Sequence, residues 1–487
     1  MNSTGLRETF RGGRLFWTGV VIVLSLAIRA PLLDATTTDT RFFVLPWFEQ
    51  LAAGGYSALG AAIPEARGGT SASYTPPYYY LLWLASPLVA VVPKLWVVKL
   101  VSIAFDFLAA FFAFKLMRLR YSQGRALVAA AVVLTAPTVL ANAAWWGQCD
   151  IIWTSLLLGS FYFSVLGWPL VSVILFGIGF ATKAQAIFFA PFLLMLFLSR
   201  EVRWWHLAVI PIVYAAMMLP AVIIGRSWLD VLTIYVRQGG HFNLLSLNAP
   251  NLYYFIPHSF YAAGTVVGSI FALLASASLA ALPRLKKATP LGIEARLLAA
   301  TTFVALSPYL LPKMHERYFF AADVFSIVLA FYVPRLWLVP VVFQASSLAA
   351  YVPIVALNVV GEGKPHFMPM AVMLNTAVIT FLVYEFWRTC TKPGERIGIS
   401  IRQFSIVVAA IVSATALWLS LAGAKALLSA SLCRGRGESS VGICMLDLPA
   451  SLTYGGRWHW LIFLALLGCS YWAAKVAILR LWGYDRR

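Results

Sequence analysis

Long apolar runs recur along the whole chain and are separated by short polar segments. A hydrocarbon core about 30 Å thick is crossed by roughly 20 apolar residues in a helix, or by fewer where neighbouring helices shield a short one. Runs of this kind predict membrane-crossing helices near residues 15–33, 96–116, 126–141, 150–167, 169–182, 185–199, 205–224, 259–282, 297–311, 319–333, 336–358, 367–388, 403–424 and 458–480. We therefore expect an all-α polytopic membrane protein with about 14 transmembrane helices, in which 169–182 and 185–199 are either two spans or one broken element.

Segment 77–92 is also apolar, and whether it crosses the membrane decides the side of every later loop. If it does not cross, most of the 37 Lys and Arg residues fall in short loops and tails on one side. Short loops rich in Lys and Arg face the cytoplasm. The charge pattern therefore favours cytoplasmic termini, and it favours 77–92 as an interfacial or re-entrant helix within a first outer loop, 34–95.

Composition excludes the soluble, fibrous and disordered classes. Hydrophobic residues make up 61% of the 487 residues and charged residues 11%, whereas a soluble domain has about 25% charged residues. The formal charge of +19 would indicate nucleic acid in a soluble protein, but in a membrane protein basic residues fix orientation. The cysteines lack metal-site spacing, and only Cys433 and Cys444 share a loop, so one disulfide there is left open.

Polar residues that are costly near lipid gather at the outer ends of the predicted spans. The first outer loop holds Asp34 and Asp39, then an amphipathic stretch with Trp47, and then the sequence from Tyr74 to Tyr78. Such a stretch is expected to lie along the interface. The alternative is a pair of solvated carboxylates beside a belt of interfacial aromatic residues.

Two further groups begin or end predicted spans. Gln148 and Asp150 stand where the positive end of a helix dipole favours a carboxylate, although Asp150 would serve equally as a helix cap. Lys183 lies between two apolar runs on the outer side, where basic residues are not the default. It is either part of an anion site at the N-terminus of the next helix or a lysine that snorkels to the interface.

The densest group is Lys313, His315, Glu316 and Arg317, four ionisable residues within five positions between apolar runs. If this segment is helical, Lys313 and Arg317 share a face. The loop 225–258 adds Asn248, beside Pro250, which serves to turn the chain. Asp106 is the carboxylate expected deep in the membrane, paired with Lys99 or with neighbouring polar groups.

Together these groups predict an anion pocket beside a carboxylate base, open to the membrane on the outer side. A lipid-linked phosphate suits such a pocket. A nucleotide sugar suits it less well, because such donors are scarce outside the cytoplasm and the sequence contains no Gly-rich phosphate loop. Because no two histidines stand at metal-ligand spacing, no metal site is expected, although Asp39 and Glu316 leave a divalent ion open.

Several ordered motifs resemble those of a known family. They are Asp39 with Phe43, Pro46-Trp47 and Gly54-Gly55, YTPPYYYLL at 74–82, WWGQCD at 145–150, KAQAIFF at 183–189, LSLNAPNLY at 245–253 and KMHERYF at 313–319. The chain resembles the GT-C superfamily of polyprenyl-phosphate-sugar glycosyltransferases. It is most similar to bacterial integral-membrane proteins related to the second mannosyltransferase of glycosylphosphatidylinositol assembly.

The resemblance implies a GT-C-like catalytic membrane core at 1–335, followed by C-terminal transmembrane helices at 336–487 with an outer loop at 425–457. It implies an inverting transfer of a hexose, with mannose expected, from a polyprenyl-phosphate-linked donor to an acceptor hydroxyl. The reaction is expected at the periplasmic or exterior face of a bacterial inner membrane, with membrane lipids and a glycan or lipid acceptor as partners. No cofactor and no nucleic acid are expected. Sugar, acceptor, prenyl length and oligomeric state stay open.

Within that reading, Asp39 is the expected general base, with Asp34 as the second choice. The residues expected to bind the donor phosphate are Lys183, His315, Arg317 and Lys313. Those expected to contact sugar or acceptor are Gln148, Asp150, Glu316, Asn248, Trp47, Tyr74 and Tyr78. The alternative function is a lipid-linked-glycan flippase or transporter without catalysis, which should place its key polar residues near the bilayer midplane rather than at one face.

Overall fold

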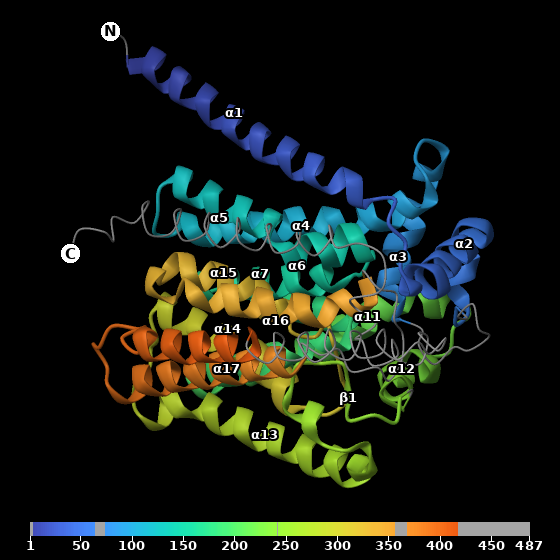
Figure 1. The fold of residues 1–487 in the computed structure, drawn as a ribbon. Helices are drawn as coiled ribbons and strands as arrows, with labels where there is room; N and C mark the ends of the chain where they lie inside the picture. Colours follow the sequence, from blue (N-terminus) through green and yellow to red (C-terminus); the bar gives the residue numbers. More distant parts are fainter. Residues whose placement is uncertain (1–2, 64–73, 241, 356–367, 417–487) are drawn as a thin grey trace, which may run out of the picture.

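The computed structural model describes residues 3–63, 74–240, 242–355 and 368–416, and only the backbone of residues 3–14. The predicted outer loop 425–457, the span 458–480 and the Cys433–Cys444 pair lie outside the described residues. Helices dominate the described part of the chain (Figure 1). The helices of the first half are α1 (Ser3–Arg29), α2 (Leu45–Gly54), α3 (Pro76–Ala85), α4 (Lys94–Arg118), α5 (Gln123–Thr135), α6 (Pro137–Val139), α7 (Asp150–Val165), α8 (Pro169–Thr182), α9 (Ala190–Leu198) and α10 (Trp204–Leu207).

The second half continues the same architecture. Its helices are α11 (Val209–Ile223), α12 (Trp228–Gly240), α13 (Tyr261–Leu285), α14 (Ile293–Leu310), α15 (Phe320–Tyr332), α16 (Leu338–Val355) and α17 (Met368–Thr391). Two strands of two residues each, β1 (Ser246–Leu247) and β2 (Met314–His315), form a single parallel pair within the described residues. The long helices run side by side, and α2, α3 and α12 gather at the end of the bundle where α1 finishes (Figure 1).

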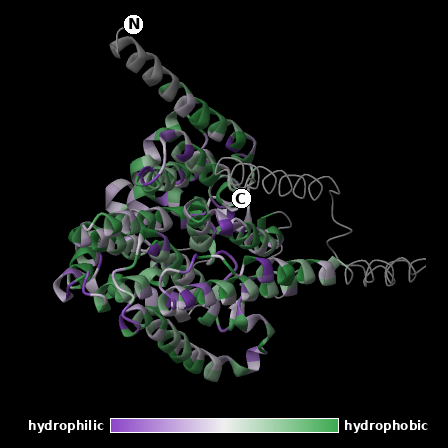
Figure 2. Cartoon of the chain, turned by 90° about the vertical axis from the view of Figure 1, so that its left-hand side faces the viewer, coloured by the Kyte–Doolittle hydropathy of each residue, from purple (hydrophilic) through white to green (hydrophobic). Residues whose placement is uncertain are grey.

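The predicted all-helical membrane fold is confirmed. Within the described residues, six helical segments are long and apolar enough to cross a bilayer, and a seventh is formed if the bent pair Gln123–Thr135 and Pro137–Trp146 counts as one span. Hydrophobic residues prevail along the described helices as a whole (Figure 2). Each predicted span from 15–33 to 403–424 contains a helix, several of them short, so the total of 14 stays a prediction.

Segment 77–92 does not form a full span. It folds as α3, which has ten residues, followed by a 3₁₀ segment at Ser86–Ala90. A ten-residue helix is about 15 Å long, half of the hydrocarbon thickness. The length therefore agrees with the interfacial or re-entrant helix that the charge pattern favours.

The centre of the bundle is formed by α7 and α15. Every residue of α15 is buried, and so are nearly all residues of α7. A helix that is apolar on all sides is covered either by other helices or by lipid, and α7 packs against α4, α8 and α15. These two helices are therefore covered by protein along nearly their whole length.

Helix α1 lies at the edge of the bundle and is tied to it by buried polar contacts. Arg29 Nη2 lies 2.8 Å from Asp106 Oδ2 and also donates to the carbonyl of Leu134 at 2.8 Å. Asp106 therefore pairs with Arg29 rather than with Lys99, whose ammonium donates to three carbonyls that follow α1. Asp323 in α15 is also fully buried, but burial does not measure depth in a membrane, so the deep position of Asp106 stays a prediction.

A proline break changes the direction of the chain after α5. Pro137 follows Ala136, whose ψ of 131° is extended, as expected for a residue before proline. The helix axis bends by 47° at this point. The chain then continues as a π-helical segment, Leu140–Trp146, and ends at Gly147 with a φ of 73°. There a Cβ atom would lie 2.9 Å from Thr40 Cγ2, so glycine allows the close approach of the first outer loop.

Candidate active site

Four segments that are far apart in sequence meet at one end of the bundle. They contribute Asp39 before the π-helical turn Thr40–Val44, Asp150 at the start of α7, Lys183 at the end of α8, and Glu316 and Arg317 before α15. We call these five residues the charged cluster. The structure brings these five predicted site residues together, and the membrane face on which they lie stays a prediction.

Asp39 lies at the edge of the charged cluster. Its Oδ2 atom accepts hydrogen bonds from Gln148 Nε2 at 2.6 Å and from Trp146 Nε1 at 3.1 Å, and it lies 3.6 Å from Arg317 Nη1. Burial raises the pKa of the Asp39 carboxyl above its ordinary value, although the nearby Arg317 charge draws that pKa down. The side chain keeps 23% of its surface exposed, so a ligand can reach it.

Asp150 lies deeper and is fully surrounded. Lys183 Nζ lies 2.5 Å from Asp150 Oδ1, Asn142 Nδ2 donates to Oδ2 at 3.0 Å, and Arg317 Nε lies 3.5 Å from Oδ2. The carboxylate also stands in the first turn of α7, where the helix dipole favours negative charge. Burial lowers the pKa of Lys183, but Asp150 beside it more than offsets this, so Lys183 stays charged.

Arg317 connects the carboxylates. Its Nη1 donates to Glu316 Oε1 at 2.9 Å, and the same guanidinium faces Asp39 and Asp150. The group also lies over the Trp146 ring, 5.5 Å from the ring centroid. A cation at this distance is attracted to the face of the ring. His315 joins this group, with its Nδ1 atom 3.7 Å from Glu316 Oε2.

The segment 313–317 is not helical. Met314 and His315 pair with Ser246 and Leu247, and the Lys313 amide donates to the Leu245 carbonyl at 2.7 Å. Pro312 favours an extended residue before it, so α14 ends before the charged residues. Lys313 and Arg317 consequently do not share a helix face, and Lys313 reaches away to the hydroxyl of Tyr261.

The structure separates the two candidate bases. Asp34 is exposed, and its Oδ1 atom accepts a hydrogen bond from Trp96 Nε1 at 2.8 Å. Asp39 alone of the pair contacts the charged cluster. Asn248 has a φ of 54° and forms an isolated bridge with His315, which brings the loop beside the cluster.

The three candidate aromatic residues form one packed group. The Trp47 ring centroid lies 5.1 Å from that of Tyr74, and the Tyr74 centroid lies 5.4 Å from that of Tyr78. Lys183 Nζ lies 5.1 Å from the Tyr74 centroid. Tyr74 therefore contacts the charged cluster, whereas Trp47 and Tyr78 are buried behind it.

Sequence reasoning missed three residues at this site. It did not assign Asn142, which holds Asp150, or give Trp146 a role, although Trp146 stands in the quoted WWGQCD motif. It also missed Tyr351 of α16, whose ring packs edge-on against Trp146 with centroids 5.4 Å apart. The polar Asn142 within an apolar run was a usable signal, but a tyrosine in a span usually indicates packing.

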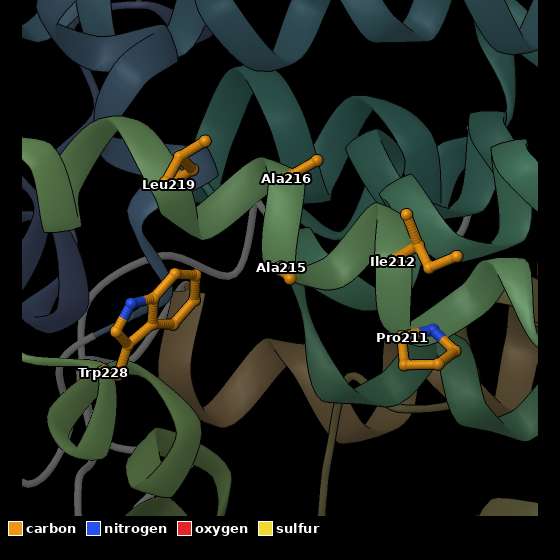
Figure 3. Close-up of a pocket in the computed structure, with 6 residues that line it drawn as sticks. All are labelled: Pro211, Ile212, Ala215, Ala216, Leu219 and Trp228. Atoms are coloured by element: carbon orange, nitrogen blue, oxygen red, sulfur yellow. The ribbon is translucent and has the colours of Figure 1, made fainter.

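An apolar groove of about 520 Å³ lies between α11 and α12 and shares no residue with the charged cluster (Figure 3). It is lined by Pro211, Ile212, Ala215, Ala216, Leu219 and Trp228. Ile212 is 65% exposed and Leu219 43%, so the groove opens on a face that a bilayer would cover. It carries no group that could act on a substrate.

In the described residues, no three His, Cys, Asp or Glu side chains are placed to hold a metal ion. Metal independence stays a prediction. The chemistry available at the cluster is that of a hydrogen-bonded, partly exposed carboxylate facing a guanidinium. Such a pair can accept a proton and stabilise a developing negative charge.

Comparison with known proteins identifies no family for this chain. No protein-family model matches the sequence, and no curated protein sequence matches it. Among solved structures, the chain is similar to ArnT from Cupriavidus metallidurans bound to undecaprenyl phosphate, with 15% sequence identity and a TM-score of 0.47. The match covers 85% of this chain and 80% of that chain. A likeness at this TM-score carries no weight, so function is argued from the side chains of the charged cluster.

Proposed function

We propose that this chain is a GT-C-type membrane glycosyltransferase. It would move a hexose, mannose by the resemblance, from a polyprenyl-phosphate donor to an acceptor hydroxyl, with inversion, at the non-cytoplasmic face of a bacterial inner membrane. The observation that carries the proposal is Asp39: a carboxylate with a raised pKa, still 23% exposed, lies 3.6 Å from Arg317 at one end of a membrane bundle.

Asp39 would act as the general base. It takes the proton of the acceptor hydroxyl while that oxygen bonds to the anomeric carbon of the sugar. The bond between that carbon and the phosphate oxygen breaks at the opposite side, and the phosphate leaves with the electron pair. Removal of the proton by a positioned base contributes roughly 10²–10⁴-fold to such a step.

The leaving phosphate would face Arg317 and His315. Arg317 is 12% exposed and His315 20%, so both can meet a ligand, and cations in a site with little water stabilise a developing anion strongly. Lys313 stays a proposed contact of the lipid phosphate. Lys183, bound to Asp150 and nearly buried, would instead hold Asp150 and Arg317 in place.

The remaining candidates would surround the sugar or the acceptor. Gln148 and Glu316 contact Asp39 and Arg317 directly, and Asn248 borders His315. We therefore propose that these three orient sugar hydroxyls. Tyr74 would form one wall of the sugar site, supported from behind by Trp47 and Tyr78.

The test uses the full chain in proteoliposomes with a panel of radiolabelled polyprenyl-phosphate sugars and an acceptor extract. One donor should lose its label with the wild type, and Asp39→Asn should lower kcat by about 10²–10⁴-fold, the worth of a general base. Asp34→Asn is the matched control, because Asp34 also follows α1 but bonds to Trp96. It should retain activity.

Three results would overturn the proposal. They are the absence of transfer from every donor, transfer unaffected by Asp39→Asn, or an equal loss with Asp34→Asn. Movement of intact lipid-linked glycan across the bilayer that survives Asp39→Asn would support a flippase instead.

A further inference from the structure

Tyr351 connects the C-terminal helices to the candidate active site. It lies in α16, its side chain is 1% exposed, and its ring meets the Trp146 ring edge-on, with centroids 5.4 Å apart and planes at 72°. Trp146 is itself fully buried. The two rings belong to an apolar group that also contains Leu348, Ala349 and Val355 of α16. The wall behind Trp146 is therefore built largely by α16.

Trp146 holds both reacting partners of the charged cluster. Its indole N–H donates to Asp39 Oδ2 at 3.1 Å, and its ring face lies 5.5 Å from the centre of the Arg317 guanidinium. A single ring orientation satisfies both contacts. A rotation of the indole would remove the hydrogen bond from Asp39 and the stacking surface from Arg317 together.

The ring of Tyr351, rather than its hydroxyl, makes this contact. The hydroxyl has no hydrogen-bond partner among the described residues, whereas the ring fills the space beside Trp146. Edge-on aromatic pairs prefer one geometry, so the ring restricts the indole more than an aliphatic side chain would.

We propose that Tyr351 is a positioning residue: its ring holds the Trp146 indole in the orientation that donates to Asp39 and stacks on Arg317. Its effect on catalysis rests on the proposed glycosyl transfer, but the contact itself does not. Loss of the ring would free the indole, and Asp39 would lose a hydrogen bond that lowers its pKa.

The test reads Trp146 directly, by ¹⁹F NMR of the full chain labelled with 5-fluorotryptophan in nanodiscs. The chain has 18 tryptophans, and Trp146→Phe identifies the signal of Trp146. In the wild type this signal should move as Asp39 titrates, and it should stop moving in Asp39→Asn. Tyr351→Leu should shift or broaden the signal and remove its pH response, whereas Tyr351→Phe should preserve both.

Tyr332→Leu is the matched control. Tyr332 is also 1% exposed, and its ring also packs edge-on, against that of Tyr121. Its hydroxyl donates to the carbonyl of Leu116, near the C-terminus of α4. It should leave the Trp146 signal unchanged. If Tyr351→Leu does not fold, Tyr351→Met provides a variant that keeps most of the volume without the ring.

Activity supplies the second readout. Tyr351→Leu should lower kcat by about 10-fold, the worth of one hydrogen bond to a charged group, with a smaller change in KM. It should also move the acid limb of the kcat profile to higher pH. Tyr351→Phe should keep both kcat and the position of the acid limb at their wild-type values.

Each outcome decides one proposal. An unchanged Trp146 signal in Tyr351→Leu, or an equal shift in Tyr351→Phe or Tyr332→Leu, would overturn the positioning role. Absence of transfer by the wild type would overturn the proposed function alone, because the NMR comparison does not depend on activity.

Discussion

Replacing Lys183 by Met should destabilise the protein because it leaves Asp150 charged and buried. The Asp150 side chain is 0% exposed and that of Lys183 is 6% exposed, with 2.5 Å between Nζ and Oδ1. Breaking a buried pair by removing one partner costs about 3–5 kcal/mol. Asn142 at 3.0 Å and Arg317 at 3.5 Å still face the carboxylate, so the lower end applies. About 3 kcal/mol is a factor of about 100 in the ratio of folded to unfolded protein.

The assay is reversible unfolding in mixed micelles, followed by tryptophan fluorescence. Lys183→Met, Asp150→Asn and the double variant form a cycle that isolates the pair. The double variant should regain most of the stability, because no buried charge is left unpaired. Lys94→Met is the control, since Lys94 pairs with Glu49 at the surface, with side chains 57% and 51% exposed. It should cost at most about 1 kcal/mol.

A Lys183→Met cost no larger than that of Lys94→Met would refute the reasoning, since Lys183 would then not be held by Asp150. The double variant also separates the two roles considered for Lys183. If it regains stability and keeps donor affinity, Lys183 is a structural partner of Asp150. If it regains stability but loses donor affinity that Asp150→Asn alone retains, Lys183 binds the phosphate, as the sequence predicts.

Two further predictions follow from the charged groups. A general base must be ionised, and burial raises the pKa of Asp39. Transfer should therefore be lost as the pH falls through that pKa, at a pH above the titration range of an ordinary aspartate. A kcat profile that falls only at the pKa of an ordinary aspartate would contradict this prediction. Arg29→Met should lower the free energy of unfolding by about 3–5 kcal/mol, because it leaves the buried Asp106 unpaired. Adding Asp106→Asn should recover most of that stability, as measured by thermal unfolding. Equal stability of the wild type and Arg29→Met would show that the pair does not anchor α1.

Sequence patterns identified the helices because burial in a bilayer requires long apolar runs, which are visible locally. They could not place the 47° bend or the π-helical segment that follows it. Pro137 marks the break, but the direction in which the chain continues depends on packing against other helices. The extended conformation within 311–319 could not be predicted either, because it depends on pairing with Ser246 and Leu247, more than 60 positions away in the sequence.

For the site, the positions of polar residues in the sequence indicated which segments come together. They did not indicate which side chains pair with one another. Asp34 and Asp39 look alike in sequence, and their contacts separate them: Asp34 bonds to Trp96, whereas Asp39 faces Arg317. Lys183 looked like a free cation because its neutralising carboxylate, Asp150, stands 33 residues earlier. Tyr351 gave no signal, since an aromatic residue in an apolar span is the ordinary composition of such a span.

The charge balance of the cluster suggests how Arg317 can contact the base, Asp39, and also stabilise the leaving phosphate in the proposed reaction. Asp39, Asp150 and Glu316 supply three carboxylates, whereas Lys183 and Arg317 supply two permanent cations. When Asp39 takes the proton of the acceptor, it becomes neutral and its attraction for Arg317 falls. The phosphate gains negative charge in the same step. The guanidinium, which stays beside the Trp146 ring, is therefore less strongly bound to the base when negative charge develops on the leaving group, and no surplus cation is required in the resting site.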